Sequence, residues 1–167
     1  MRRVEGIHQM DNTRPTSAII TPERPDTADA ILLITELEAH LEQFYPSESR
    51  HGFSVEKLLA EEVAFFVLRA SGEPASCGGV KLFGSDYGEI KRMYVRPEFR
   101  GQGFGKRMLR HLADYAQARG IDLLRLETGI YQREAIALYE SIGFRRIPPF
   151  GSYTDDPLSL CYELRLA

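Results

Sequence analysis

The sequence predicts a single mixed α/β domain, and three observations lead to that prediction. The chain has 167 residues, a length that suits one compact domain rather than two. Its composition is that of a globular protein, with 43% hydrophobic and 27% charged residues. Segments with strand-like and helix-like hydrophobic periodicity alternate along the chain. We expect the domain to span residues 16–167, because residues 1–15 are polar and aperiodic and are interpreted as a disordered extension.

The N-terminal third predicts one short strand and two helices. The strand is expected over residues 17–20, and Asp26 is expected to cap the first helix. Four apolar residues at helical spacing predict the buried face of this helix: Ile34, Leu37, Leu41 and Phe44. Pro46 cannot continue the helix, and Ser54 begins a shorter one that runs to about residue 60.

The middle of the chain predicts three consecutive strands. Residues 63–69 are rich in β-branched and aromatic types, and the turn residues 71–74 lead into a second strand up to Leu82. A third strand is expected over residues 89–95. Strand alternation places Arg92 and Tyr94 on one of its faces, and Lys91, Met93 and Val95 on the other.

The C-terminal part predicts two helices and three strands. Gly120 and Gly143 each follow a helical pattern and are expected to end those helices in the left-handed conformation. The expected elements are a helix over 106–119, a strand over 121–127, a helix over 133–142, and strands over 144–147 and 158–166. The predicted order is therefore β-α-α-β-β-β-α-β-α-β-β.

Charge and composition exclude several classes of function. The chain carries 21 basic and 24 acidic residues and contains no Lys/Arg block, so nucleic acid and anionic membranes are not expected partners. No stretch approaches the roughly 20 apolar residues of a membrane helix. Nothing resembling a signal peptide follows the first residues, so we expect a cytoplasmic protein.

The sequence contains no metal-binding pattern. Cys77 and Cys161 lie 84 positions apart and are interpreted as small apolar residues within strands. The four histidines are scattered without ligand spacing, so we expect no metal.

The most informative segment reads Arg100-Gly101-Gln102-Gly103-Phe104-Gly105-Lys106 and lies between a strand and a helix. Glycines let the main chain approach a ligand closely, and the free N–H groups of a helix start favour phosphate. The letters fit neither a dinucleotide-binding G-x-G-x-x-G nor a P-loop. Taken alone, the segment could equally be a turn that starts a helix; taken as a site, it predicts a phosphate ligand.

Three motifs in register resemble the GNAT superfamily of acyl-CoA-dependent N-acetyltransferases. Arg100, Gly103 and Gly105 fill the places of the family's Arg/Gln-x-x-Gly-x-Gly/Ala pyrophosphate loop. Residues 89–95 resemble its central strand, and residues 132–144 resemble its Asn-x-x-Ala-x-x-Leu-Tyr-x-x-x-Gly-Phe signature, with Gln132 in place of the usual Asn. The resemblance implies a twisted, mostly antiparallel sheet of six or seven strands flanked by about four helices.

The resemblance also implies how acetyl-CoA is held. Family members open a gap beside the central strand, where the pantetheine arm bonds to strand backbone, here at Met93, Tyr94 and Val95. The cofactor-binding residues are expected to be these three, residues 100–106 and Gln132. A backbone donor near the thioester oxygen and the proximity of the amine favour direct transfer without a covalent enzyme intermediate.

Catalytic roles follow from the same resemblance. Glu89 looks like the glutamate that serves as base in histone-acetylating relatives, and its place early in the strand predicts a position at the rim of the cleft. Glu127 or a water chain is the alternative base. Tyr139 resembles the family tyrosine that protonates or hydrogen-bonds the leaving sulfur.

The acceptor is expected to bind between residues 45–53 and 150–157. The acidic residues expected to attract its amine are Glu48, Asp155 and Asp156, and the aromatic residues expected to wall it are Tyr45, Phe150 and Tyr153. We expect a small amine or an amino-acid-like metabolite, with a peptide or protein amino group as the alternative. A CoA-sensing binding module and a homodimer also remain open.

Overall fold

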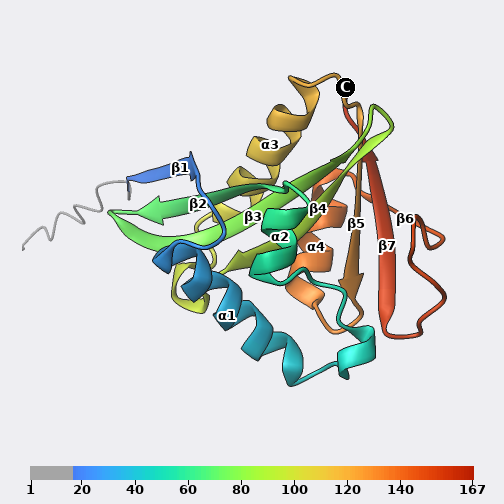
Figure 1. Ribbon diagram of the computed structural model, residues 1–167, viewed down its shortest axis with the longest axis horizontal. Coiled ribbons are helices and arrows are strands. Elements are labelled where there is room, and N and C mark those ends of the chain that lie inside the picture. The colour runs from blue at the N-terminus through green and yellow to red at the C-terminus, as the bar shows by residue number, and fades with distance from the viewer. Residues whose placement is uncertain (1–16) are drawn as a thin grey trace, which may run out of the picture.

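The computed structural model describes residues 17–167, so the extension expected at residues 1–15 lies outside the described range. Within that range one seven-stranded sheet runs in the order β1-β2-β3-β4-β5-β7-β6, with four α-helices around it (Figure 1). The strands are β1 Ala18–Pro22, β2 Ala64–Ala70, β3 Glu73–Phe83, β4 Tyr87–Val95, β5 Leu123–Gly129, β6 Arg145–Ile147 and β7 Ser159–Arg165. The helices are α1 Ala28–Glu42, α2 Val55–Ala60, α3 Phe104–Gln117 and α4 Arg133–Ile142. The predicted element order and fold class are confirmed.

The strands β4 and β5 separate soon after they meet. Every neighbouring pair in the sheet is antiparallel except this one, which is parallel. Only Gly88 with Leu124 and Glu89 with Arg125 are paired, although β4 continues to Val95 and β5 to Gly129. The last six residues of β4 therefore have no partner strand on this side, as the family resemblance implied.

A β-bulge changes which residues of β4 share a face. Cys77 of β3 pairs with Tyr94 and Gly79 with Lys91, so the single residue between them on β3 faces two residues of β4. One of those two, Arg92, has a left-handed φ of 55°. The expected alternation is wrong at Lys91, which lies on the same face as Arg92 because the bulge inserts one residue. Strict alternation cannot anticipate an inserted residue.

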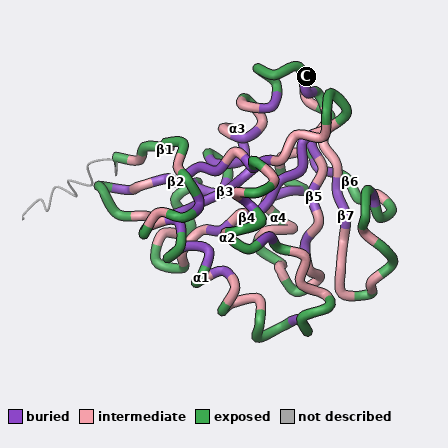
Figure 2. Tube along the Cα trace, in the orientation of Figure 1, coloured by how far each residue is buried: buried purple, intermediate pink, exposed green. Residues whose placement is uncertain are grey.

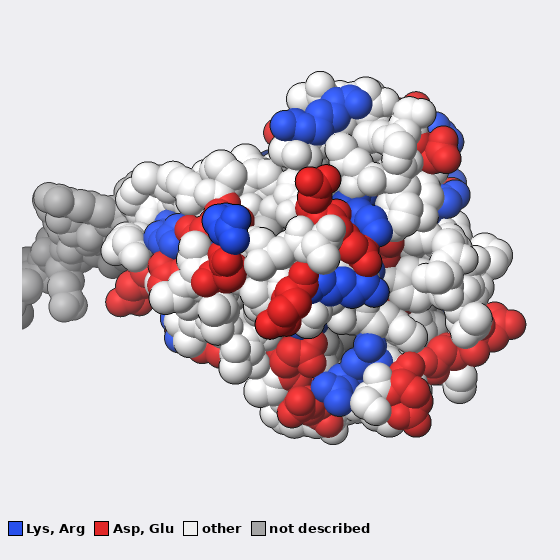
Figure 3. Space-filling model, in the orientation of Figure 1, with Lys and Arg blue, Asp and Glu red and all other residues white. Residues whose placement is uncertain are grey.

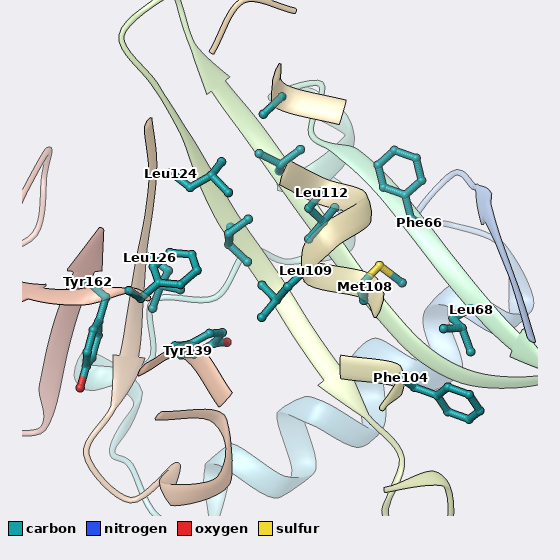
Figure 4. Packing of buried hydrophobic residues seen from close by; sticks show 14 of the residues in the cluster. Phe66, Leu68, Phe104, Met108, Leu109, Leu112, Leu124, Leu126, Tyr139 and Tyr162 are labelled. Carbon is teal, nitrogen blue, oxygen red and sulfur yellow. The ribbon is translucent and has the colours of Figure 1, made fainter. Parts of the chain in front are cut away.

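The sheet carries a hydrophobic core on each face. Figure 2 shows that the buried residues concentrate in the central strands. On one face α3 packs Met108, Leu109 and Leu112 over the sheet, close to Leu124 and Leu126 of β5 (Figure 4). On the other face the buried residues of α1 and α2 form a second cluster with β2 and β3: Ala30, Leu33, Ile34, Leu37, Leu58, Phe65, Val67 and Cys77.

The first helix differs from the prediction at both ends. Thr27 caps it, because the Thr27 Oγ1 accepts the backbone N–H of Ala30 at 3.3 Å, whereas Asp26 pairs with Arg24. Phe44 lies beyond the end of α1 and is 43% exposed. The helix turns a neighbouring stripe toward the sheet, so Leu33 rather than Phe44 completes the buried face.

The predicted cap of α2 and the predicted glycine stops after α3 and α4 agree with the structure, although α3 begins at Phe104 rather than at residue 106. The hydroxyl of Ser54 accepts the backbone N–H of Lys57 at 3.2 Å and caps α2. Gly120 and Gly143 follow α3 and α4 with left-handed φ angles of 79° and 113°. Glycine is suited to this stop because it has no Cβ to clash. Cys77 and Cys161 are free and buried, as expected.

Candidate active site

The separation of β4 from β5 opens two adjoining cavities. The larger, of about 530 Å³, lies between the end of β4, the glycine loop and the start of α4. The smaller, of about 110 Å³, lies between β4, β5 and the chain that follows α1. The residues that line both cavities are Leu37, Met93, Gln132, Ala135 and Tyr139. A molecule in one cavity can therefore meet a molecule in the other at this junction.

The glycine loop presents main-chain donors to the larger cavity. Gly101 and Gly103 have φ angles of 79° and 80°, which only glycine adopts without strain. Gly103 precedes α3 with no side-chain cap, and the first turn of this 14-residue helix holds no acidic residue. The free N–H groups and the helix dipole therefore favour a phosphate group here. Gly105 has a different role, because a Cβ there would lie 2.9 Å from Leu138 of α4.

Nearly all the predicted cofactor-binding residues line the larger cavity. They are Met93, Tyr94, Val95, Arg100, Gly101, Gly103, Phe104, Gly105, Lys106 and Gln132. Gln102 does not line it, and the side chain of Phe104 is buried in the core, so only the Phe104 main chain can face a ligand. The Arg100 Nε donates to the Val95 carbonyl at 3.0 Å and ties the loop to the end of β4.

Gln132 is turned toward the chain that follows α1. Its Nε2 donates to the hydroxyl of Tyr45 at 3.4 Å, and the same hydroxyl accepts the backbone N–H of Tyr131 at 3.0 Å. Tyr45 packs so closely against Gly129 that a Cβ at Gly129 would overlap its ring. These contacts fix the start of α4 at the junction of the two cavities.

Tyr139 lies at that junction. It projects from α4, is 6% exposed and packs edge-on against Phe144. Burial, followed by the charge of Glu127, raises the pKa of Tyr139 above its ordinary value. The phenol therefore stays protonated near neutral pH and can donate a proton or a hydrogen bond.

Glu127, near the end of β5, lines the smaller cavity. Its Oε1 accepts the hydroxyl of Ser159 at 2.9 Å. Burial is the main reason that the pKa of Glu127 is raised, because a buried carboxylate loses its hydration. A carboxylate with a raised pKa is a stronger base than an exposed one, which suits it to accept a proton.

Glu89 lies inside the protein rather than at the rim. It is 4% exposed, and it lies between Lys81 of β3 and Arg125 of β5 in the sheet register. Its carboxylate accepts the hydroxyl of Tyr153 at 2.5 Å and lies 2.9 Å from the Lys91 ammonium. The expected rim position is wrong because a central strand is covered on both edges here. Glu89 lines neither cavity.

The two segments expected at the acceptor site contribute differently from the prediction. Residues 45–53 line the smaller cavity through Tyr45, Ser49, Arg50, His51 and Gly52, and residues 150–157 do so through Tyr153. The acidic residues Glu48, Asp155 and Asp156 do not line it, and neither does Phe150. Asp155 and Asp156 border a separate hollow beside β6.

Basic residues of the smaller cavity were missed by sequence reasoning. Arg50, His51, Lys91 and Arg92 all line it. No pattern in the sequence brings residues 50–51 next to residues 91–92. The proximity arises from the chain path after α1 and from the bulge in β4.

Residues 17–167 contain neither a metal-binding cluster nor a membrane-spanning helix. This part of the chain contains no group of three His, Cys, Asp or Glu side chains placed to bind a metal ion. None of its helices is long and apolar enough to cross a membrane. Figure 3 shows acidic and basic side chains interspersed on one face rather than a patch of one sign.

Comparison with known proteins identifies the family. Residues 33–144 match the model of the acetyltransferase (GNAT) family. The chain belongs to the GNAT family. An "IAA acetyltransferase" of Azospirillum brasilense is 42% identical over 145 residues, which cover 86% of this chain and 95% of that protein. This chain is therefore a GNAT-type N-acetyltransferase, an enzyme that acts on an amine acceptor.

Solved structures of GNAT proteins have the same fold. A Klebsiella pneumoniae structure described as an acyl-CoA N-acyltransferase is 36% identical, with a TM-score of 0.77 over 90% of this chain and 98% of that one. An N-acetyltransferase of Thermoplasma acidophilum in complex with coenzyme A is 19% identical, with a TM-score of 0.70 over 89% and 99% of the two chains. The second likeness concerns the fold alone.

Proposed function

We propose that this GNAT enzyme transfers an acetyl group from acetyl-CoA directly to the primary amine of a small, amino-acid-like metabolite. The observation that carries the proposal is the junction of the two cavities, where Met93, Gln132 and Tyr139 line both. A thioester brought to this junction from the larger cavity would meet an amine held in the smaller one. Holding two reactants together in this way supplies a large part of the rate enhancement of such transfers.

The residues of the larger cavity fit acetyl-CoA. The uncapped start of α3 and its two left-handed glycines offer N–H groups to the diphosphate, while Arg100 and Lys106 add positive charge. The main chain of Met93–Val95 has no partner strand on the side of the gap and can bond to the pantetheine arm. One of these N–H groups would polarise the thioester carbonyl. Acetyl-CoA supplies the activated acetyl group.

One side chain of the smaller cavity has the properties of a base, and one side chain at the junction has those of an acid. We assign the role of general base to Glu127, because it lines the smaller cavity, where the acceptor would bind, and because its pKa is raised. Glu89 remains the alternative base, although it is paired with Lys91 and Tyr153. Tyr139 stays protonated because it is buried, and we assign it the role of donating a proton or a hydrogen bond to the leaving sulfur of CoA.

The size of the smaller cavity supports a small acceptor over a peptide. Its volume of about 110 Å³ corresponds to only a few water molecules at ~30 Å³ each. Side chains close it on several sides, among them Tyr45, His51 and Tyr153. An extended peptide would need an open groove in their place.

The test is a thiol-release assay with acetyl-CoA and a panel of amines, amino acids and short peptides. We expect release with small amines, and we expect Tyr139→Phe to lower kcat by about 10²-fold or more while the KM for acetyl-CoA stays within a few fold. Tyr115→Phe on α3, away from both cavities, is the matched control. Peptide-only activity would identify a peptide enzyme, and acetyl-CoA binding without release would identify a sensor.

A further inference from the structure

The smaller cavity contains an arginine pair that acetyl transfer to a plain amine does not need. Arg50 follows α1 and Arg92 stands at the bulge of β4, yet both contact the carboxylate of Glu38 on α1. The Arg50 Nη1 lies 3.2 Å from the Glu38 Oε2, and the Arg92 Nη2 pairs with the Glu38 Oε1. Two guanidinium groups thus share one carboxylate beside the acceptor cavity.

Both arginines keep a buried donor without a partner. The Nε atoms of Arg50 and Arg92 are buried, and neither makes a hydrogen bond to the described chain. The Arg92 side chain is only 3% exposed, so water can hardly compensate. A buried donor with no partner is unfavourable, so unpaired N–H groups on two residues that line one cavity are an indication of a missing ligand.

The positive charges of Arg50 and Arg92 are only partly compensated by buried carboxylates. Glu38 is shared by both arginines, and the other partner of Arg50, Glu42, is 61% exposed and therefore screened by water. Lys91 adds no free charge, because Glu89 lies 2.9 Å from its Nζ. The two arginines are thus matched by one half-buried carboxylate that they share and by one exposed carboxylate that contacts Arg50 alone.

Two backbone features, the conformation of Arg92 itself and the close approach of Gly52, hold the Arg92 guanidinium in place. Arg92 has a φ of 55°, a left-handed conformation that is unfavourable for a non-glycine residue. Gly52 lies against the guanidinium so closely that a Cβ there would be 2.8 Å from the Arg92 Cζ and nearer still to Nη1. Strained residues that the surroundings hold in place occur mainly at functional sites.

We propose that Arg50 and Arg92 form a subsite for a carboxylate group of the acceptor. The fork of an arginine matches a carboxylate in two parallel hydrogen bonds. The same cavity contains Glu127, whose charge attracts an ammonium group. A cavity with both signs suits a zwitterion, so the acceptor class is the amino acids rather than amines without a carboxylate. This inference rests on the proposed function and names its substrate class.

The test compares matched small acceptors that differ only in the carboxylate: alanine with ethylamine, and serine with ethanolamine. We expect kcat/KM to favour the amino acid by about 10- to 100-fold, mostly through KM, because hydrogen bonds to charged groups are worth about 1.5–3 kcal/mol. Arg50→Met should reduce this preference about tenfold or more, and Arg50→Lys should reduce it less. Arg165→Met, at a 71% exposed side chain on β7, is the matched control.

The outcomes separate the subsite from the proposed function. An unchanged preference in a folded Arg50→Met, or no preference in the wild type, overturns the subsite while leaving acetyl transfer intact. An equal loss of activity on both members of each pair shows a purely structural arginine and also overturns it. If no acceptor is acetylated, titration of alanine and serine by calorimetry with CoA present decides. Binding that is lost in Arg50→Met supports the subsite, whereas binding that Arg50→Met retains, or no binding to the wild type, refutes it.

Discussion

The glycine loop allows its structural and binding roles to be separated, because α3 has a left-handed glycine at each end. Gly103 and Gly120 have φ angles of 80° and 79°, and a Cβ at either would meet no atom within 4 Å. Replacement by alanine should cost each about 1–2 kcal/mol from the backbone alone. For a chain of this size that is a fall of about 2–8 °C in Tm. The two variants should therefore be destabilised alike.

Only Gly103→Ala should affect acetyl-CoA. The added Cβ would stand at the uncapped start of α3, whereas Gly120 lies at the far end of the 14-residue helix, about 20 Å away. We expect the KM for acetyl-CoA to rise about tenfold in Gly103→Ala and to stay within twofold in Gly120→Ala. Thermal melts and steady-state kinetics at saturating acceptor measure both effects.

A particular result would refute this reasoning. If both variants lose the same stability and keep the wild-type KM for acetyl-CoA, the start of α3 does not bind the diphosphate. If both raise the KM equally, the effect is a general loss of order in α3 rather than a contact at the loop.

Two further variants address the acceptor cavity. Burial raises the pKa of Glu127, so its protonated form stabilises the fold, and this contribution is lost as the pH rises through the raised pKa. The Tm of the wild type minus the Tm of Glu127→Gln should therefore decrease as the pH is raised from 4.5 to 8. Thermal melts that show a constant difference across this range would contradict the raised pKa. Gly52→Ala should displace the Arg92 guanidinium and reduce the preference for amino acids about tenfold with the KM for acetyl-CoA kept. An unaltered preference in the same paired assay would show that the position of this arginine does not matter.

Local patterns identified several backbone features of the chain. The glycines of the loop, the two left-handed helix stops and the cap at Ser54 depend on residues a few positions apart, and the structure agrees with each. The prediction for α1 was less accurate. Several neighbouring apolar stripes can serve as a buried face, and contacts with the sheet select among them.

The residues of the smaller cavity were predicted less well from the sequence. The sequence favoured Glu89 over Glu127 as the base, and it predicted that Glu48, Asp155 and Asp156 supply the charge. Of these five residues only Glu127 lines the smaller cavity. The structure instead brings basic residues of two distant segments into one cavity.

The sequence by itself determined the order of elements, the cap of α2 and the glycine stops of α3 and α4, because these depend on backbone conformations that neighbouring residues dictate. Only the tertiary structure decided which carboxylate lines the smaller cavity and which basic side chains line it too. Those relations depend on an inserted residue in β4 and on packing between segments about 40 positions apart, Arg50 and Arg92 among them. Such contacts form only after the sheet and helices have assembled.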